Sequence, residues 1–366
     1  MRVTPRYHKR VSILERYGVN MVRDVYIDGM HALDLGIGMF IANEFEKVSV
    51  PGMDAWKLPE LEKVMVDARA YQPKEFNRKF QPFSRHVHWK ANEHRNFLLF
   101  ILPVLSVHLK VKDETLPFYR MFIMLFVGLR ILSYEPFATN AVWIDDAERM
   151  LSDFFKSFVK HYGPHRVTMK IHQILHIADQ VRTSGRPLYA PSAYPFESYM
   201  SSIKNALHSG NLPLSQLHRR FVEIYNSQRI VGNVRSKIVE LAYKVGDVNE
   251  LKHVISKGTF IATVLKDSIF AIGSKEKIVR IVKILRGVDS KIQLITQRLM
   301  HLENLFTTGL NSSEIGVFRT DMVCARETET YELTHVLHKL FAIPIPFEGG
   351  FALIPMTHVN STSKDM

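Results

Sequence analysis

Apolar side chains recur at helical spacing through most of the first half of the chain. In "DAERMLSDFFKSFVKHYG", residues 146–163, the apolar stripe runs through Ala147, Leu151, Phe154, Phe158 and Tyr162. The stripe stops at a Gly-Pro pair, and glycine commonly ends a helix. The pattern therefore predicts an amphipathic helix that ends at residue 163.

Two longer apolar runs predict buried helices. They lie within residues 93–109 and 116–133, and Pro103 is expected to kink or end the first. Each run is shorter than the roughly 18 residues that a membrane span needs. We therefore expect core helices and no membrane contact, with residues 56–190 forming a helical unit.

Near the N-terminus, the apolar residues recur in an alternating pattern, as in a strand, and not at helical spacing. "MVRDVYID", residues 21–28, places Met21, Val25 and Ile27 at alternating positions and predicts a strand that ends at Asp28. The mixed small and apolar residues that follow predict a helix beginning near Met30.

The pattern changes again towards the C-terminus. Residues 211–246 are typical of a helix or a broken helix, whereas short alternating runs from Gly258 onward predict a small β-rich domain. One run in that domain, "KIQLITQRLMHLENLF", fits a strand or a helix equally well.

Charge and cysteine content narrow the partners and the compartment. The chain has 48 basic and 36 acidic side chains, a formal net charge of +12. This excess fits a polyanionic partner such as DNA and equally fits a solvated basic surface. Cys324 is the only cysteine, which excludes a disulfide framework and a cysteine-based zinc finger and fits a reducing compartment.

Three acidic and histidine clusters are candidates for chemistry. Glu197 follows Pro195 at an expected helix start, where a carboxylate can cap the helix or serve as a catalytic acid. Asp28 and His31 lie at the expected strand end, where they could bind a metal or form local hydrogen bonds.

His172, His176 and Asp179 form the third cluster and share one face of the predicted helix "MKIHQILHIADQVR". Two imidazoles one turn apart can bind a transition metal. No glutamate stands at the second position of the pair and no fourth ligand can be identified, which argues against a zinc site; a structural polar network is the alternative.

Basic residues supply the candidates for nucleic-acid contacts. Trp89 and Lys90 lie in the base-rich stretch "HVHWKANEHR", where an aromatic ring could stack on a base or lie in the core. The better candidates for phosphate contacts follow the glutamate helix or lie within it: Lys204, Arg219, Arg220, Arg229, Arg235 and Lys237.

Three pieces in order resemble the cut-and-paste transposases of the CACTA, or En/Spm-like, group. They are "DGMHALDLGIG", "HQILHIADQVRTSGRPLYAPSAYPFESYM" and "FALIPMTH". The resemblance implies a ribonuclease-H-like core in which three acids hold two Mg²⁺ or Mn²⁺ ions for attack on DNA phosphate. In that family a helical domain precedes the third acid, and Glu197 matches its position. Asp28 and His31 match a second signature.

The resemblance also implies strands before residue 20, and about twenty residues are too few for three strands and their turns. We therefore expect a truncated nuclease core. The predicted fold is α+β, mostly α, with a ribonuclease-H-like remnant in residues 1–55. The helical insertion follows in 56–190, the glutamate helix and basic segment in 191–250, and the β-rich domain in 251–366.

The sequence thus favours a nuclear, transposase-derived protein that contacts DNA and lacks strand transfer by itself. One alternative is an active metal-dependent nuclease that uses Asp28, Glu197 and a further acid such as Asp24 or Asp34. The other is a helical scaffold that binds another protein or a second copy of itself.

Overall fold

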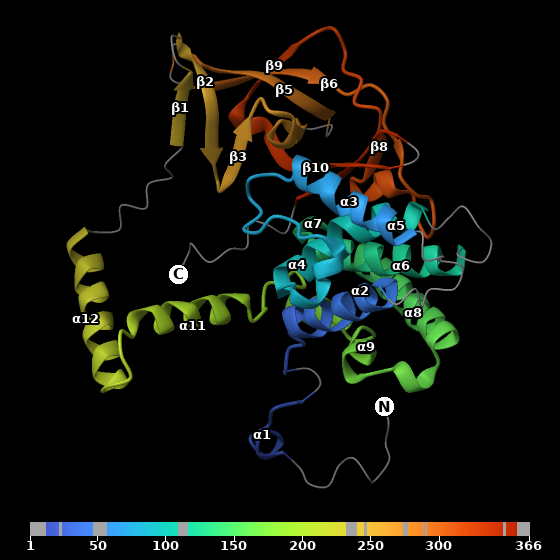
Figure 1. Cartoon of the computed structure of the whole chain (residues 1–366), viewed down its shortest axis with the longest axis vertical. Coiled ribbons are helices and arrows are strands. Elements are labelled where there is room, and N and C mark those ends of the chain that lie inside the picture. The colour runs from blue at the N-terminus through green and yellow to red at the C-terminus, as the bar shows by residue number, and fades with distance from the viewer. Residues whose placement is uncertain are drawn as a thin grey trace.

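Helices form the first part of the chain and an antiparallel β-sheet forms the last part (Figure 1). The computed structural model describes residues 12–21, 24–46, 57–108, 116–231, 240–244, 247–273, 277–287, 289, 291–346 and 349–356. The fold class is therefore mixed α+β.

The helical part contains long α-helices and two π-helical segments, η1 (Met30–Gly38) and η3 (Phe97–Ile101). The first α-helices are α1 (Ile13–Arg16), α2 (Met39–Glu46), α3 (Lys57–Tyr71), α4 (Ala91–Asn96), α5 (Leu102–His108), α6 (Leu116–Ser133) and α7 (Glu135–Ala138). The others are α8 (Ala141–Tyr162), α9 (Met169–Gln173), α10 (Ile177–Ser184), α11 (Tyr194–Ala206) and α12 (Pro213–Val231). Short 3₁₀ turns occur at η2 (Phe83–His88) and η5 (Pro164–Arg166).

Helix α6 lies at the centre of this part. By length and composition it could cross a membrane, with a mean hydropathy of 1.5, but 78% of it is buried inside the protein. It packs closely against α8, because a Cβ placed on Gly128 would lie 2.6 Å from Leu151 Cδ2. The glycine therefore permits the close approach of the two helices.

The strands all pair antiparallel. They are β1 (Glu240–Lys244), β2 (Asp247–Ser256), β3 (Thr259–Ala262), β4 (Ile269–Ile272), β5 (Lys277–Arg286), β6 (Ile292–Arg298), β7 (Glu303–Asn304), β8 (Phe318–Thr320), β9 (Glu329–Glu332), β10 (Val336–Pro344) and β11 (Phe351–Pro355). The order is β1-β2-β5-β4-β10-β11-β8-β7, with β3 beside β2 and β6 between β5 and β9. Three 3₁₀ turns connect them: η6 (Leu265–Asp267), η7 (Ser312–Ile315) and η8 (Leu333–His335).

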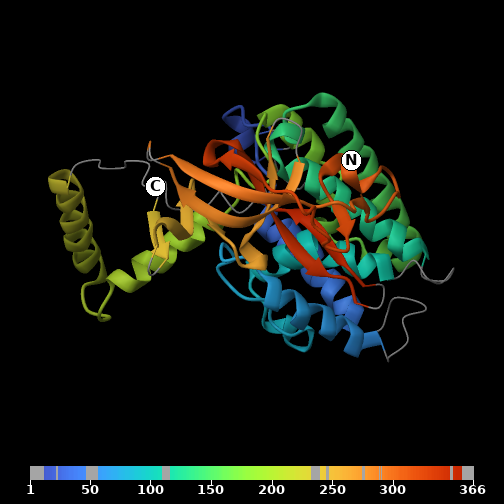
Figure 2. The same ribbon diagram turned by 90° about the horizontal axis from the view of Figure 1, so that it is seen from above.

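One hydrophobic core joins the helices to the sheet. Phe341 and Ile343 of β10, with Ile354 of β11, belong to the same buried cluster as α6 and α8. Helix α3 lies against β10, as both ribbon views indicate (Figures 1 and 2). The two parts therefore share an interior.

A buried charge cluster crosses the same boundary. The Lys339 ammonium on β10 lies 2.8 Å from both oxygens of Glu75 and 2.7 Å from Asp267 Oδ1. It also donates to the Phe260 carbonyl at 2.7 Å. The side chains of Lys339, Glu75 and Asp267 are between 2% and 6% exposed, so one ammonium group bridges two carboxylates away from water.

Several predicted helices are confirmed. The helix expected to end at residue 163 is α8, and Gly163 caps it with a φ of 82°. The two buried runs are α4–η3–α5 and α6. Pro103 does not end the first run, because the chain forms the π-helical segment η3 just before it and continues into α5. The helix predicted near Met30 is present as η1 with π-helical geometry.

The strand predicted over 21–28 is wrong for the residues that are described there. Residues 24–28 form no strand, and the side chain of Gln180 on α10 takes the role of a strand partner. Its Oε1 accepts the Ile27 amide at 2.7 Å, and its Nε2 donates to the Ile27 carbonyl at 3.4 Å. One side chain thus satisfies both backbone groups of Ile27.

Four other predictions need correction or completion. The helix expected across 211–246 gives way to strand β1 at Glu240, and the ambiguous run at Lys291 forms strand β6. Before Glu240 the described residues contain no strand, so they show none of the sheet that a ribonuclease-H-like remnant in residues 1–55 would require. The predicted helix over 169–182 is broken into α9 and α10.

Candidate functional site

Asp28 ties the start of η1 to the segment that enters α11. Its Oδ1 accepts the backbone N–H of Met30 at 3.1 Å and the backbone N–H of Ala193 at 2.9 Å. Ala193 directly precedes α11, whose first turn carries Pro195 and Glu197. The Asp28 carboxylate therefore brings two segments together that are far apart in the sequence.

His31 lies between Asp28 and Glu197. Its Nδ1 contacts Asp28 Oδ2, and its Nε2 lies 3.4 Å from Glu197 Oε1. The His31 side chain is 53% exposed and that of Glu197 is 61% exposed, so solvent screens this contact. The three residues that the sequence analysis nominated as catalytic candidates thus meet in one place.

Asp34 occupies a fully buried cage beside them. The Tyr189 hydroxyl donates to Asp34 Oδ1 and the Tyr194 hydroxyl to Oδ2, both at 2.7 Å. The Arg95 guanidinium lies over the Tyr189 ring, 3.9 Å from its centroid, and 5.6 Å from that of Tyr194. The cage fixes the linker before α11 against η1 and α4.

Burial dominates the electrostatics of this cage. Loss of water raises the pKa of Asp34 from 3.8 to about 7, although Arg95 and the two tyrosine hydroxyls oppose this rise. The pKa values of Tyr189 and Tyr194 are raised by burial and by the nearby Asp34 charge. The proton of Asp34 is therefore gained or lost near neutral pH.

A pair of divalent ions does not fit the carboxylates as they lie. Among the residues that the structure describes, no three histidine, cysteine, aspartate or glutamate side chains gather where they could hold a metal ion. His31 stands between Asp28 and Glu197, and both Asp34 oxygens accept tyrosine hydroxyls. Asp24 instead accepts the Asn20 amide in a local turn, at 2.7 Å.

The histidine cluster on α9 and α10 gathers only in part. His172 Nε2 and His176 Nε2 lie 3.3 Å apart on the surface. Asp179 turns away from them towards Arg182, 3.4 Å from its Nη1. Arg182 also pairs with Asp145 and Glu148 of α8, which favours the polar-network interpretation over a zinc site.

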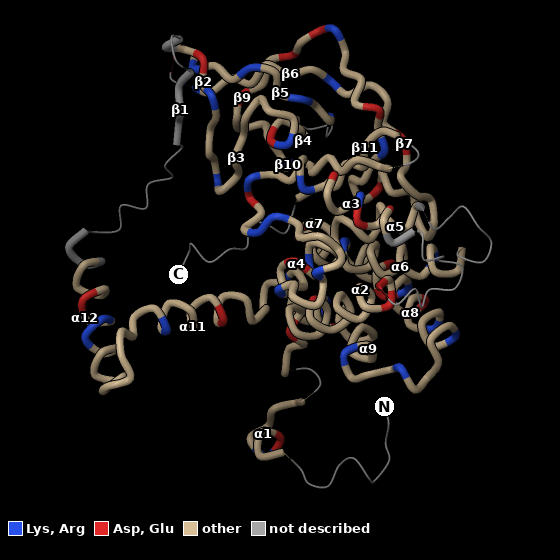
Figure 3. Tube along the Cα trace, viewed as in Figure 1, with Lys and Arg blue, Asp and Glu red and all other residues tan. Residues whose placement is uncertain are grey.

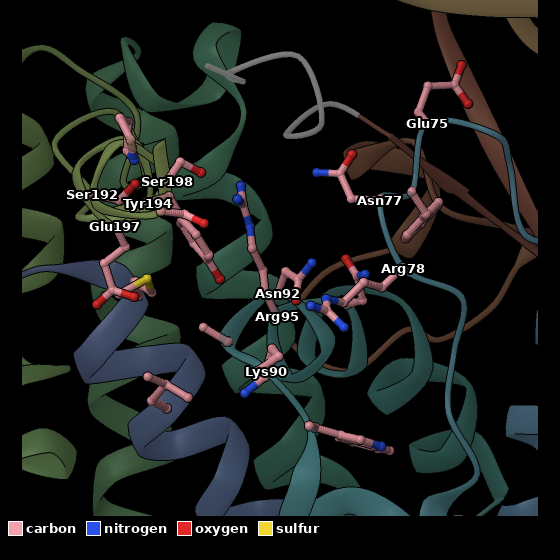
Figure 4. A pocket seen from close by; sticks show the side chains of 18 residues that line it. Glu75, Asn77, Arg78, Lys90, Asn92, Arg95, Ser192, Tyr194, Glu197 and Ser198 are labelled. Carbon is pink, nitrogen blue, oxygen red and sulfur yellow. The ribbon is translucent and has the colours of Figure 1, made fainter. Parts of the chain in front are cut away.

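A pocket of about 640 Å³ opens beside Glu197 (Figure 4). Arg78, Lys90 and Arg95 line it together with the amides of Asn77, Asn92 and Asn96. Ser192, Tyr194, Glu197 and Ser198 come from the opposite wall, at the start of α11 (Figure 4). The pocket therefore lies between the segment 77–96, a loop followed by η2 and α4, and the glutamate helix.

Trp89 is a correction to the predicted nucleic-acid contacts. Its side chain is only 6% exposed and packs among Phe83, His94 and Phe97. Its ring therefore packs mainly against core side chains, and Trp89 also contributes to the lining of the pocket. Lys90, the neighbouring candidate, is exposed at the pocket.

Four of the remaining basic candidates lie on an arm formed by α11 and α12, which extends away from the rest of the protein (Figures 1 and 2). Lys204 is exposed on α11, and Arg219 and Arg220 are exposed on α12 (Figure 3). Arg220 is partly engaged by Glu223 at 2.8 Å. Arg229 belongs to α12, and Arg235 and Lys237 lie outside the described residues.

The residues that surround Asp28 and Glu197 are not evident from the sequence. Tyr189 and Tyr194 lie in the linker "GRPLYAPSAYPFE", and Arg95 lies in the stretch around Trp89. Two tyrosines within a proline-rich linker give only a weak signal, because nothing in their spacing pairs them with Asp34. Apart from its charge, nothing in the sequence indicates that Arg78 belongs to the site.

Residues 236–356 match a family described as a domain of unknown function (DUF8592). The match covers about a third of the chain and spans the described sheet from β1 to β11. No curated protein matches the chain, and no solved structure matches it either. The sheet is thus similar to a domain of unknown function, and the match does not extend to the helical site.

Proposed function

We propose that this chain is a transposase-derived, nuclear protein that contacts DNA and has no strand-transfer activity by itself. The observation that carries the proposal is the meeting of Glu197 with Asp28 and His31, the residues through which the sequence resembles CACTA transposases. A descent from a ribonuclease-H-like core is part of the proposal. The family of the sheet has no known function and does not bear on it.

The local chemistry favours binding over cleavage. Two-metal catalysis needs carboxylates that bridge ions about 4 Å apart. Here an imidazole separates Asp28 from Glu197, and Asp28 already accepts two backbone amides. Binding without cleavage requires only attraction to phosphate, and the exposed cations on the arm supply that attraction.

The proposal is tested by binding to a labelled random duplex across a salt series, with and without Mg²⁺ or Mn²⁺. We expect affinity to fall steeply with salt and no cleavage to occur. Lys204→Glu combined with Arg219→Glu should lower the slope of log affinity against log salt by about one for each phosphate interaction that the substitutions remove.

A charge-matched control is available on α8. Arg149→Glu combined with Lys156→Glu changes the net charge by the same amount at two exposed positions. An equal loss of affinity in the control would show that net charge, and not the arm, attracts DNA. Metal-dependent cleavage that Glu197→Ala abolishes would overturn the proposal in favour of an active nuclease.

One observation favours a second candidate, a protein-interaction scaffold. Helix α11 buries none of its residues, and Phe196, Met200 and Leu214 on the arm are 71%, 62% and 80% exposed. Exposed apolar patches often mark protein contacts. Absence of DNA binding at low salt, with loss of a protein complex on Phe196→Ser and Met200→Ser, would support the scaffold.

A further inference from the structure

The pocket beside Glu197 carries more positive than negative charge. Arg78 and Lys90 are exposed at its rim and form no ion pair within the described part of the chain. Of the two acids in the lining, Glu75 is held by Lys339, and Glu197 lies against His31. The lining thus holds three cations and two acids, and Arg78 and Lys90 pair with neither acid.

The third cation, Arg95, is held in a fixed position. Its guanidinium stacks on the Tyr189 ring, and its charge acts on Asp34 in the cage. Arg95 thus adds positive charge from the base of the lining.

The rest of the lining suits a ligand with polar edges and a flat apolar face. Asn77, Asn92 and Asn96 provide amides that can donate and accept, and Ser192, Ser198 and Ser201 provide hydroxyls. Phe76, Tyr194 and Pro195 add aromatic and apolar surface. A volume of about 640 Å³ lies within the range of small-molecule sites.

We propose that this pocket binds one nucleotide unit, with its phosphate at Arg78, Lys90 and Arg95. Guanidinium and ammonium groups are the preferred partners of phosphate oxygens. The amides and rings would then face the sugar and the base. The inference rests on the proposed function in one respect only, because it expects the nucleotide to be the end of a DNA strand and not a free mononucleotide.

The test compares three probes on the full chain. They are a thymidine hexamer with a 5′-phosphate and a 3′-fluorophore, the same hexamer with a 5′-hydroxyl, and free deoxyadenosine monophosphate as a competitor. We expect the 5′-phosphate to tighten binding by about tenfold, and Arg78→Ala or Lys90→Ala to remove that gain. Both side chains are exposed, so these variants should fold.

Arg85→Ala is the matched control, since Arg85 is exposed on η2 and does not line the pocket. Competition by the mononucleotide at concentrations similar to the hexamer's affinity would identify a free nucleotide as the ligand, and much weaker competition would identify a strand end. Equal affinity for the two hexamers, or an equal effect of Arg85→Ala, would overturn the inference.

Failure of this inference is distinct from failure of the proposed function. Duplex binding that depends on the arm, without any preference for the 5′-phosphate, would overturn the pocket alone. A 5′-phosphate preference without duplex binding would retain the pocket and overturn the DNA-binding proposal.

Discussion

Single side chains in the tyrosine cage determine how the stability of this protein responds to pH. Asp34 is fully buried, and its pKa of about 7 lies far above that of an aspartate in an unfolded chain. The folded state therefore holds a proton that the unfolded state releases near pH 4. By linkage, the stability contribution of Asp34 is complete below about pH 4 and is lost as pH rises to about 7.

Asp34→Asn is expected to abolish that dependence. The difference in unfolding free energy between wild type and variant should fall by about 1.4 kcal/mol per pH unit between pH 4 and 7 and then level off. Urea unfolding at several pH values measures it. Buried His94 and half-buried His338, whose pKa values are lowered to about 4, titrate in both proteins and cancel in the difference. A constant difference would mean that Asp34 stays ionised.

At the scale of single residues, only part of the site could be predicted from the sequence. Asp28, His31 and Glu197 were found through the resemblance, and the structure brings them together. The cage and the pocket were not predicted, because their members come from separate segments whose contacts leave no periodic pattern. From the sequence alone, an arginine that stacks on a tyrosine from another segment, as Arg95 does on Tyr189, looks the same as an arginine in an exposed basic stretch.

At the scale of elements, helical periodicity was a reliable guide and the short alternating run was not. Helices α6 and α8 follow their apolar stripes, because a stripe buried on one side is what a core helix requires. The run ending at Asp28 alternates like a strand, yet its hydrogen bonds go to the Gln180 amide. A side chain that substitutes for a neighbouring strand cannot be identified from local pattern.

The packing of α6 against α8 gives a prediction at this scale. Gly128→Ala would place a methyl group 2.6 Å from Leu151 Cδ2 and Cγ. Overpacking of this kind costs about 1–3 kcal/mol, and better helix propensity returns up to about 1 kcal/mol. We expect thermal or urea unfolding to show a net loss of about 1–2 kcal/mol.

Gly210→Ala is the corresponding control, because no heavy atom lies within 4 Å of a Cβ built there. It should change stability by less than about 0.5 kcal/mol. If Gly128→Ala proved equally harmless, Leu151 would have room to rotate and the two helices would be less closely packed than this distance implies.

At the scale of the whole molecule, Lys339 holds the sheet to the helical part. Lys339→Met would leave Glu75 and Asp267 buried without their cation, and such a change typically costs about 3–5 kcal/mol. Chemical unfolding measures the loss. Lys63→Met, which breaks the exposed pair with Asp67 on α3, should cost about 0.5 kcal/mol or less. Similar losses in both would argue that water reaches the Lys339 cluster.

The same lysine has a consequence for ligand recognition. Glu75, Asn77 and Arg78 belong to one short loop, which Gln72 braces through the Arg78 carbonyl and the Phe80 amide. The sheet therefore sets the position of one wall of a cavity that it does not itself line. In a mutational screen, substitutions in β10 could weaken ligand binding as if they removed a direct contact to the ligand. Every altered atom would nevertheless be remote from the bound molecule.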